Sequence, residues 1–352
     1  MPAIKSRLIP LLRWSEKYTK TDMVYLARGG FWMIAGQMLS AIIAFGLAIA
    51  FANLISRETY GNYKYILSIG GALGALSLSG LGTYVTQSVA KKMEGALRFS
   101  FKLNLKWSLP LIFVALIGAV YYGYQQNYIL ALSLVLIAVF APLLNSSQLY
   151  SSFLAGKGDF RRASIFNFCI SFFQAACLLT ALFFHMGVLG LVFVYLAANT
   201  TATFACYIMT LKLFHPNEHF NKQIARLSTN LSFMGILGPL VGQLDKVLIF
   251  HFLGAAPVAV YVLAQAPIVQ MRSVLKLSTP LSLPKLAALD RATVTKTIEG
   301  KLSRFLIGIV VMVTTYIVLA PFLFHTFFPA YPDAIRYSQV YALLLLLFPK
   351  KL

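Results

Sequence analysis

Residues 107–156 read WSLPLIFVALIGAVYYGYQQNYILALSLVLIAVFAPLLNSSQLYSSFLAG. The stretch is 50 residues long and contains no charged side chain. About 20 apolar residues cross a bilayer as a helix, so it is too long for one span. The polar segment 122–127 lies near its middle and reads as a tight turn. The stretch therefore predicts two membrane-spanning helices joined by that turn.

Charge-free segments of span length occur on both sides of this pair. The chain is 59% hydrophobic and 11% charged, whereas a soluble globular protein has about a quarter charged residues. Lipid-exposed backbone must satisfy its own hydrogen bonds, so the expected fold is all-α, a polytopic membrane helix bundle. Ten spans are predicted: 29–56, 65–90, two within 107–156, two within 163–211 separated at 185–187, 228–252, 255–271, 305–324 and 337–352.

The basic residues predict the orientation of these spans. The net charge of +20 comes from 30 Lys and Arg against 10 Asp and Glu. Of the 30, six precede the first span, five lie in 91–106, three in 157–162, three in 212–226, seven in 272–304 and two at 350–351. The opposite loops hold only Arg57, Lys64 and Arg336. This bias predicts a cytoplasmic N-terminus and indicates membrane topology rather than nucleic-acid binding.

The first 28 residues alternate apolar and basic side chains. They suit either an amphipathic helix on the cytoplasmic leaflet or a plain basic tail that enforces topology. The first apolar run begins after this segment and is longer than the apolar core of a signal peptide. We therefore expect no cleavable signal peptide.

A short internal repeat indicates two lobes. Residues 51–63 resemble residues 250–261, since Leu54 matches Leu253 and Tyr63 matches Tyr261, with one residue deleted in the second copy. Parallel repeats of this kind build alternating-access carriers. The expected organisation is a basic cytoplasmic segment 1–28, an N-lobe of six spans at 29–211, a cytoplasmic linker at 212–226 and a C-lobe of about four spans at 227–352. A complete second repeat would end near residue 409, so we expect the second lobe to lack about two helices.

Motifs of soluble enzymes are absent from the sequence. It has no GxxxxGK, HExxH or GxSxG pattern, so no ATP hydrolysis, other catalysis or cofactor is expected. His215-Pro-Asn-Glu-His219 fits the HxxEH zinc pattern formally, but Pro216 disfavours the helix that would align the ligands. Cys169, Cys177 and Cys206 lie in apolar stretches and are interpreted as lipid- or core-facing side chains.

Small residues and one proline predict where helices pack or bend. Gly70 with Gly74, and Gly238 with Gly242, form GxxxG pairs, which in apolar helices usually indicate close helix packing or backbone flexibility rather than phosphate binding. Pro239 lies between the glycines of the second pair, so the seventh span is predicted to be kinked or broken there. Such a break can serve as a hinge.

The strongest functional signal is Gln243-Leu-Asp245-Lys246 inside the seventh span. An ionisable group at the bilayer centre costs about 2.5–3.5 kcal/mol on insertion scales, so such groups usually face a cavity. The alternative is that Asp245 and Lys246 neutralise neighbours or extend to the interface. Adjacent helical residues point about 100° apart, so a close pair between these two is not expected. Protonation of Asp245 would provide a way to couple a proton gradient to lobe movement.

Other polar residues in or near the spans complete the candidate transport site. Basic residues that can ring a cationic cavity are Arg28, Arg57, Lys64, Lys246 and Arg272, and Gln37 and Gln265 are polar residues inside spans. A single polar residue such as Gln37, Gln265 or Arg272 more often bonds to a neighbouring helix than to a ligand. Since Arg and Lys are the usual partners of phosphate, a phosphate-bearing or acidic-sugar substrate is expected.

Four segments together resemble a known family. They are residues 26–37 (LARGGFWMIAGQ), 55–61 (ISRETYG), 244–254 (LDKVLIFHFLG) and 258–261 (VAVY). They are similar to the polysaccharide transport proteins, the Wzx-type O-antigen and capsule flippases of the multidrug/oligosaccharidyl-lipid/polysaccharide exporter superfamily. Members of that family typically have 12 to 14 helices in two lobes, more than the ten predicted here.

The resemblance implies a function, a location and partners. It implies translocation of an undecaprenyl-pyrophosphate-linked oligosaccharide across the bacterial inner membrane, with membrane lipids and other polysaccharide assembly proteins as partners. A second hypothesis from the same fold is a cation-coupled multidrug exporter, but its cationic substrates would favour acidic cavity residues, and the first-lobe spans contain none. A third is a membrane polymerase or ligase of polysaccharide assembly, which would need a sizeable periplasmic loop.

Overall fold

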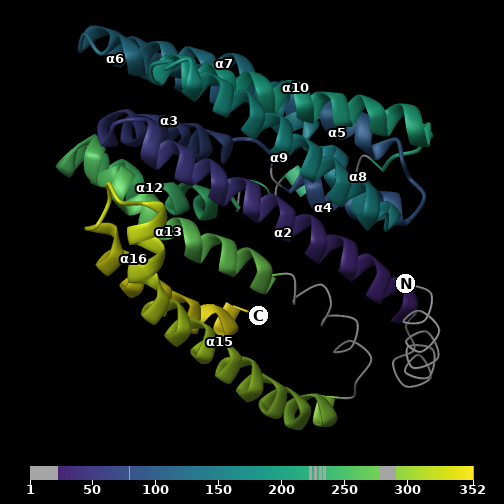
Figure 1. Ribbon diagram of the computed structural model, residues 1–352. Coiled ribbons are helices and arrows are strands. Elements are labelled where there is room, and N and C mark those ends of the chain that lie inside the picture. Colours follow the sequence, from purple (N-terminus) through teal and green to yellow (C-terminus); the bar gives the residue numbers. More distant parts are fainter. Residues whose placement is uncertain are drawn as a thin grey trace. The chain divides into compact units, whose positions relative to one another are not determined.

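The computed structural model describes residues 23–78, 80–221, 224–225, 228–229, 232, 235–276 and 291–351, with side chains from residue 30 except at 276–305 and beyond 347. All regular secondary structure in these residues is helical (Figure 1), which confirms the predicted all-α class. The chain forms two compact units. The central unit is residues 46–262, and the terminal unit comprises the described parts of 1–45 and 263–352.

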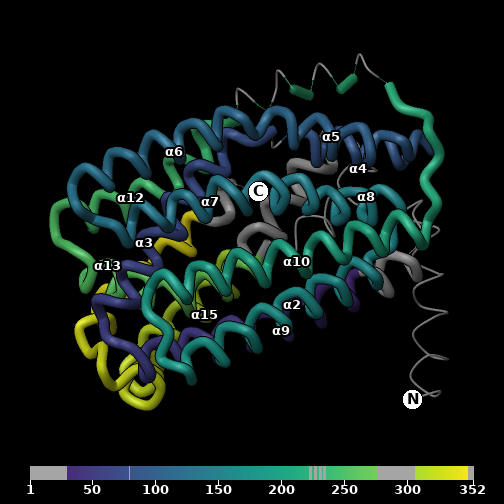
Figure 2. Tube along the Cα trace, turned by 90° about the horizontal axis from the view of Figure 1, so that it is seen from above, coloured from purple at the N-terminus to yellow at the C-terminus, as the bar shows by residue number. Residues whose placement is uncertain are grey.

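The central unit contains the end of α2 (Met23–Leu54) and the start of α13 (Ala255–Lys276). Between them lie α3 (Arg57–Gly74), α4 (Leu81–Ala90), α5 (Ala96–Trp107), α6 (Leu109–Tyr124), α7 (Tyr128–Ser147), α8 (Leu149–Lys157), α9 (Phe160–Phe183), α10 (Val188–Phe214) and α12 (Leu237–Leu253). α7 packs between α6 and α10, α10 also packs against α9, and α12 packs against α3. Figure 2 shows α7, α10 and α9 running side by side.

The terminal unit contains the rest of α2 and α13 together with α15 (Arg291–Phe327), α16 (Ala334–Ala342) and a final 3-10 helix, η1 (Leu343–Lys351). Its core joins Ile268 of α13 to Ile309, Val313 and Tyr316 of α15. The ring of Phe45 meets the rings of two phenylalanines at the end of α15, with centroid distances of 5.9 and 5.7 Å. Apolar side chains thus hold this unit together.

Seven described helical stretches are long and apolar enough to cross a membrane. They are 30–54, 96–124, 128–157, 160–183, 188–214, 255–275 and 306–327. The chain is therefore a multi-pass membrane protein. The breaks predicted at 122–127 and 185–187 are confirmed, since α6 ends at Tyr124, α7 begins at Tyr128, and the α9 to α10 turn covers residues 184–187. Asn127 caps α7, because its side-chain oxygen accepts from the backbone N–H of Leu130 at 3.3 Å.

Three of the ten predicted spans are not single long helices. The span predicted at 65–90 is divided into α3 and α4, the described helix of the seventh span has 17 residues, and residues 337–351 form the end of α16 and η1. In addition, the membrane-spanning stretch expected from residue 107 begins at Ala96, because α5 precedes α6. α5 buries one narrow face while its basic residues point outward. Hydropathy alone did not reveal these differences, because helix breaks depend on which partners take over the backbone hydrogen bonds.

Side chains from other helices satisfy the backbone at the break between α3 and α4. The N–H of Leu78 donates to Oδ1 of Asn104 on α5 at 3.1 Å. The N–H of Gly80 donates to Oγ of Ser232 at 2.9 Å. A Cβ at Gly80 would lie only 2.6 Å from the carbonyl oxygen of Ser228, so glycine is needed for this approach. The break is thus fixed by contacts with distant parts of the chain.

The repeat is visible in the helix ends. α2 ends at Leu54 and α3 follows after two residues, whereas α12 ends at Leu253 and α13 follows after one. The single deletion predicted from the sequence therefore falls in the turn. α3 and the first residue of α13 approach closely, since a Cβ at Gly61 would overlap the carbonyl of Ala255. The division into lobes at 29–211 and 227–352 stays a prediction, and the compact units have different bounds.

The two glycine pairs behave differently. A Cβ at Gly70 would lie 3.3 Å from Ile137 on α7, and one at Gly74 would lie 3.7 Å from Asn145, which agrees with the predicted packing role of this pair. A Cβ at Gly238 or Gly242 would meet nothing within 4 Å, so the described residues show no close packing at the second pair, and the alternative role, backbone flexibility, stays a prediction. Pro239 lies in the first turn of α12, where its missing N–H costs no helical hydrogen bond. The chain is thus broken before α12 rather than kinked within it.

Polar contacts join the loops at one end of the central unit. Glu94 forms an ion pair with Lys157, and the backbone N–H of Glu94 donates to Oδ1 of Asn217 at 3.0 Å. The N–H of Gly95 donates to the carbonyl of His219 at 3.0 Å. The segment with the formal HxxEH pattern is not helical and packs on this loop. Basic residues at 91–106, 157–162 and 212 therefore gather at this end.

The opposite end of the central unit is joined by aromatic residues. The hydroxyls of Tyr65 and Tyr122 are 2.9 Å apart, and the ring of Tyr65 stacks on Phe250 with a centroid distance of 3.6 Å.

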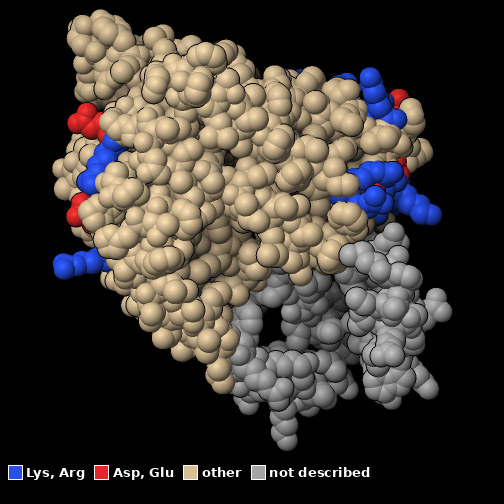
Figure 3. All heavy atoms as spheres, in the orientation of Figure 1, with Lys and Arg blue, Asp and Glu red and all other residues tan. Residues whose placement is uncertain are grey.

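On the face drawn in Figure 3, the visible Lys and Arg side chains gather at two opposite edges, and the area between them is free of charge. Residues 1–22, which hold most of the predicted basic segment, lie outside the described residues.

We predict that the end of the central unit that contains His219 faces the cytoplasm. Gln126 and His219 are exposed, and the spans between them place them at opposite ends. In a variant without Cys169, Cys177 and Cys206, a membrane-impermeant maleimide added outside should label Gln126→Cys and not His219→Cys. Labelling of His219→Cys alone would show that the predicted orientation is wrong and that this end faces outside.

Candidate functional site

In the turn of α12 that contains Gln243, Asp245 and Lys246, the lysine contacts the other two side chains. Nζ of Lys246 donates to Oε1 of Gln243 at 2.9 Å, and it lies 3.8 Å from Oδ1 of Asp245. Helical side chains lean toward the N-terminus, so a lysine reaches the residue three positions earlier more readily than its neighbour. The 3.8 Å separation is that of an ion pair, and Oδ1 of Asp245 also accepts the backbone N–H of Lys246 at 2.8 Å, so the expectation that these two residues do not form a close pair is wrong. Their side chains are 35% and 18% exposed.

Asp245 has its own partner on α13. The hydroxyl of Tyr261 donates to Oδ2 of Asp245 at 2.7 Å. A hydrogen bond to a carboxylate is stronger than one between neutral groups, and this length is typical of such bonds. The contact therefore links the ionisable turn of α12 to the following helix across the turn at Gly254.

Lys64 belongs to α3, the helix that packs against α12, and lies over two tyrosine rings. Its Nζ lies 5.4 Å from the ring centre of Tyr60 and 5.6 Å from that of Tyr63, within the range of cation–π attraction. The ring of Tyr63 stacks on Phe51 and meets Tyr195 edge-on, with centroid distances of 5.0 and 6.2 Å. Lys246 lies on α12, the helix that packs against α3.

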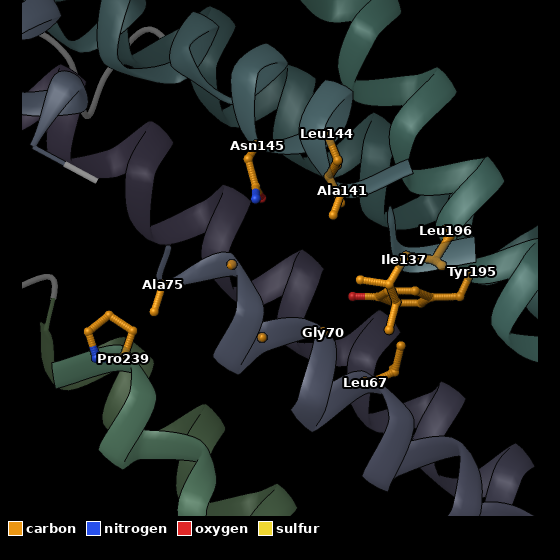
Figure 4. Close-up of a pocket in the computed structure, with 12 residues that line it drawn as sticks. Leu67, Gly70, Ala75, Ile137, Ala141, Leu144, Asn145, Tyr195, Leu196 and Pro239 are labelled. Atoms are coloured by element: carbon orange, nitrogen blue, oxygen red, sulfur yellow. The ribbon is translucent and has the colours of Figure 1, made fainter. Parts of the chain in front are cut away.

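A cavity of about 290 Å³ lies within the central unit, and Figure 4 shows residues that line it. Four helices line it, α3, α7, α10 and α12, through Leu67, Gly70, Gly71, Gly74, Ala75, Ile137, Ala141, Leu144, Asn145, Tyr195, Leu196 and Pro239. The lining is mostly apolar. Its amide group, Asn145, donates to the hydroxyl of Ser77 at 2.8 Å.

The cavity and the charged groups share contacts. A Cβ at Gly71, which lines the cavity, would lie 3.0 Å from Nε2 of Gln243. Gln243 in turn accepts the hydrogen bond from Lys246. Tyr195 lines the cavity and packs against the tyrosine under Lys64. We name Lys64, Gln243, Asp245, Lys246 and this cavity together the central site.

The structure brings together only part of the predicted site. Arg57 is the first residue of α3, two turns or about 10 Å before Lys64. Gln37, which is half-buried, the buried Gln265 and the exposed Arg272 belong to the terminal unit. Nε2 of Gln265 makes no hydrogen bond within the described part of the chain. The side chain of Arg28 lies outside the described residues.

Sequence reasoning missed the aromatic partners of the charges. Tyr63 and Tyr261 were matched to each other in the repeat without a role, yet one lies under Lys64 and the other binds Asp245. Their equivalent positions in the repeat were the signal that could have found them. Tyr195 and Gly71 had no such signal, because their importance comes from packing against other helices.

The central site combines charged groups with an apolar space. It holds two ammonium groups, one carboxylate and several tyrosine hydroxyls beside an apolar space. The described residues contain no group of three or more His, Cys, Asp or Glu side chains placed to hold a metal ion.

The sequence matches the family model described as polysaccharide biosynthesis protein over residues 26–290. This range includes every residue of the central site. No curated protein matches the sequence significantly.

Several solved structures share the fold. A MATE transporter in complex with MaD5 is 15% identical with a TM-score of 0.58, covering 92% of this chain and 80% of that chain. A MOP superfamily transporter from Pyrococcus furiosus, described as having a binding pocket of reverse polarity, is 15% identical with a TM-score of 0.54, covering 92% and 79%. The MATE multidrug transporter DinF-BH is also 15% identical, with a TM-score of 0.51 and coverage of 92% and 94%.

We predict that Tyr261→Phe lowers the free energy of unfolding in detergent by about 1 kcal/mol, because Asp245 loses a hydrogen bond. In an Asp245→Asn background the same change should cost clearly less. Thermal or denaturant unfolding of the four proteins measures this difference. Tyr124→Phe, at an exposed tyrosine, is the matched control. Equal costs in both backgrounds would show that Tyr261 does not bind the Asp245 carboxylate.

Proposed function

The chain belongs to the polysaccharide biosynthesis protein family, and on this basis we propose that it is a flippase for an undecaprenyl-pyrophosphate-linked oligosaccharide. The cargo would be an O-antigen, capsule or exopolysaccharide repeat unit that moves from the cytoplasmic to the periplasmic leaflet. The fold shared with MOP superfamily transporters supports transport by alternating access. In this proposal the chain acts as a transporter and not as an enzyme.

The observation on which the proposal mainly depends is that α3 and α12, which pack against each other, carry one lysine each, Lys64 and Lys246. Ammonium groups inside a helix bundle are unfavourable unless an anion or a carboxylate balances them. Asp245 balances one charge, so the central site keeps an excess positive charge. The pyrophosphate of a lipid-linked sugar supplies the missing negative charge, and Lys side chains bind phosphate as point charges.

Asp245 gives the site a group whose charge can change. Protonation would remove the negative charge that the Tyr261 hydroxyl binds, and so weaken the link between α12 and α13. A change in that link is a means of coupling an ion gradient to movement of one helix group against another. We infer that the gradient acts through Asp245.

A multidrug exporter is the second candidate, and Asp245 is the feature that favours it. One structure that shares the fold is a MATE multidrug transporter, and a carboxylate could neutralise a cationic drug. The polarity of the site favours an anion instead, since lysines outnumber carboxylates there. The turns described opposite the His219 end are short, which disfavours a polymerase or ligase with a large periplasmic loop.

The proposed location is the bacterial inner membrane with a cytoplasmic N-terminus, beside other proteins of polysaccharide assembly. The deciding measurement is the sidedness of lipid-linked oligosaccharide in a strain deleted for this gene. Accumulation on the cytoplasmic face that the restored chain relieves would support the flippase. Normal sidedness with increased sensitivity to cationic dyes would support the drug exporter instead.

We predict that Lys64→Gln and Lys246→Gln each lower the rate of oligosaccharide translocation in proteoliposomes by about tenfold or more, because a charge-assisted contact to the pyrophosphate is lost. Lys64→Arg should retain much of the rate. Lys102→Gln, at an exposed lysine on α5, is the control and should behave as wild type. Unchanged rates in both central-site variants would rule out this anion site.

We predict that Asp245→Asn abolishes the acceleration of transport by an imposed proton gradient, because an amide cannot take up the proton. The measurement compares translocation with and without a pH difference across the proteoliposome membrane. Glu58→Gln changes an exposed carboxylate in the first turn of α3 and serves as the control. A variant that transports at the normal rate and still responds to the gradient would refute coupling through Asp245.

A further inference from the structure

The cavity of the central site is too apolar to be explained by the pyrophosphate or the sugars. Glycine, alanine, leucine and isoleucine side chains make up most of its wall, together with the ring of Tyr195 (Figure 4). The amide of Asn145, a polar group in this wall, donates a hydrogen bond to Ser77. An apolar wall of this kind favours hydrocarbon over water or sugar hydroxyls.

Two residues connect the cavity wall to the lysines. Leu67 lines it and lies one turn from Lys64 on α3. On the opposite side, Gln243 touches Gly71 of the wall and holds the ammonium of Lys246. A ligand whose anionic group lies between the two lysines would therefore place the atoms next to that group into the apolar space.

The size of the cavity limits what it can hold. An apolar cavity of about 150 Å³ in a protein core binds benzene, which has six carbons. A volume of about 290 Å³ is roughly twice as large, which leaves room for about ten to twelve carbons. This is two isoprene units, and neither a whole polyprenyl chain nor an oligosaccharide.

We propose that the cavity binds the two isoprene units next to the pyrophosphate of the lipid carrier. This inference rests on the proposed function, because it assigns a further part of the same substrate to the same site. The glycines at positions 70, 71 and 74 provide the space, since a side chain at any of them would enter the cavity or displace a neighbour. The site then recognises the junction between lipid and pyrophosphate, which is independent of the sugar sequence.

Binding of short prenyl pyrophosphates to the full chain in nanodiscs tests this proposal. The probes are inorganic pyrophosphate and its dimethylallyl, geranyl and farnesyl esters, with empty nanodiscs subtracted. Geranyl pyrophosphate should bind about tenfold or more tightly than inorganic pyrophosphate, because it buries apolar surface. The gain should level off between geranyl and farnesyl, when the cavity is full.

Two variants fill the cavity from different helices. Gly74→Leu on α3 and Ala141→Leu on α7 should abolish most of the gain from the prenyl group and leave the affinity for inorganic pyrophosphate within about twofold of wild type. Gly46→Leu is the matched control, because a Cβ there meets nothing within 4 Å and Gly46 does not line the cavity. It should bind every probe as wild type does.

The outcomes separate this inference from the proposed function. If pyrophosphate binding requires Lys64 and Lys246 but the prenyl group adds nothing, or its gain survives both filling variants, the inference is wrong while the flippase proposal stands. An equal gain from decyl pyrophosphate would mean that any alkyl chain is accepted, and would overturn the isoprenoid assignment. If wild type binds none of the probes, both proposals fail.

Discussion

A hydrocarbon bilayer offers no hydrogen-bonding partners, so each backbone amide and each charge inside it must find a partner within the protein. The described chain meets this constraint first by being helical. Where a helix stops inside the bundle, side chains replace the lost bonds, as Asn104 and Ser232 do at the break between α3 and α4. The same constraint acts on Lys246, whose ammonium binds Gln243, and on Asp245, which binds Tyr261.

Close contact between α3 and α12 places these satisfied polar groups beside a second cation. Glycines permit the approach, since Gly61 leaves room for the carbonyl of Ala255 and Gly71 leaves room for Gln243. As a result Lys64 and Lys246, which are far apart in the sequence, lie on two helices that pack against each other, and Lys246 is paired with one carboxylate. The absence of side chains at the glycines also opens the cavity next to them. Charge and apolar space thus have a common structural origin.

This combination suits an amphiphile with an anionic junction. A pyrophosphate would balance the lysines, and the adjoining hydrocarbon would fill the cavity, while the sugars would need no specific contact in the central site. Tyrosines around Lys64 lower the cost of keeping its charge when no substrate is bound, because cation–π attraction partly replaces hydration. Binding energy would then come from the part of the substrate that all lipid-linked repeat units share.

The sequence by itself determined the helical class, most span positions, the turns at 122–127 and 185–187, and the repeat whose deletion falls at Gly254. These features depend on about 20 consecutive residues or on a short turn, so local hydropathy and charge suffice to predict them. It also singled out Gln243, Asp245 and Lys246, because a charge within an apolar run is conspicuous. Only the tertiary structure decided that Lys246 binds Gln243 and that Tyr261 binds Asp245. It also decided that α3, which carries Lys64 and part of the cavity wall, packs against α12. Those contacts depend on how closely distant helices pack, and hydropathy along one chain contains no information on that distance.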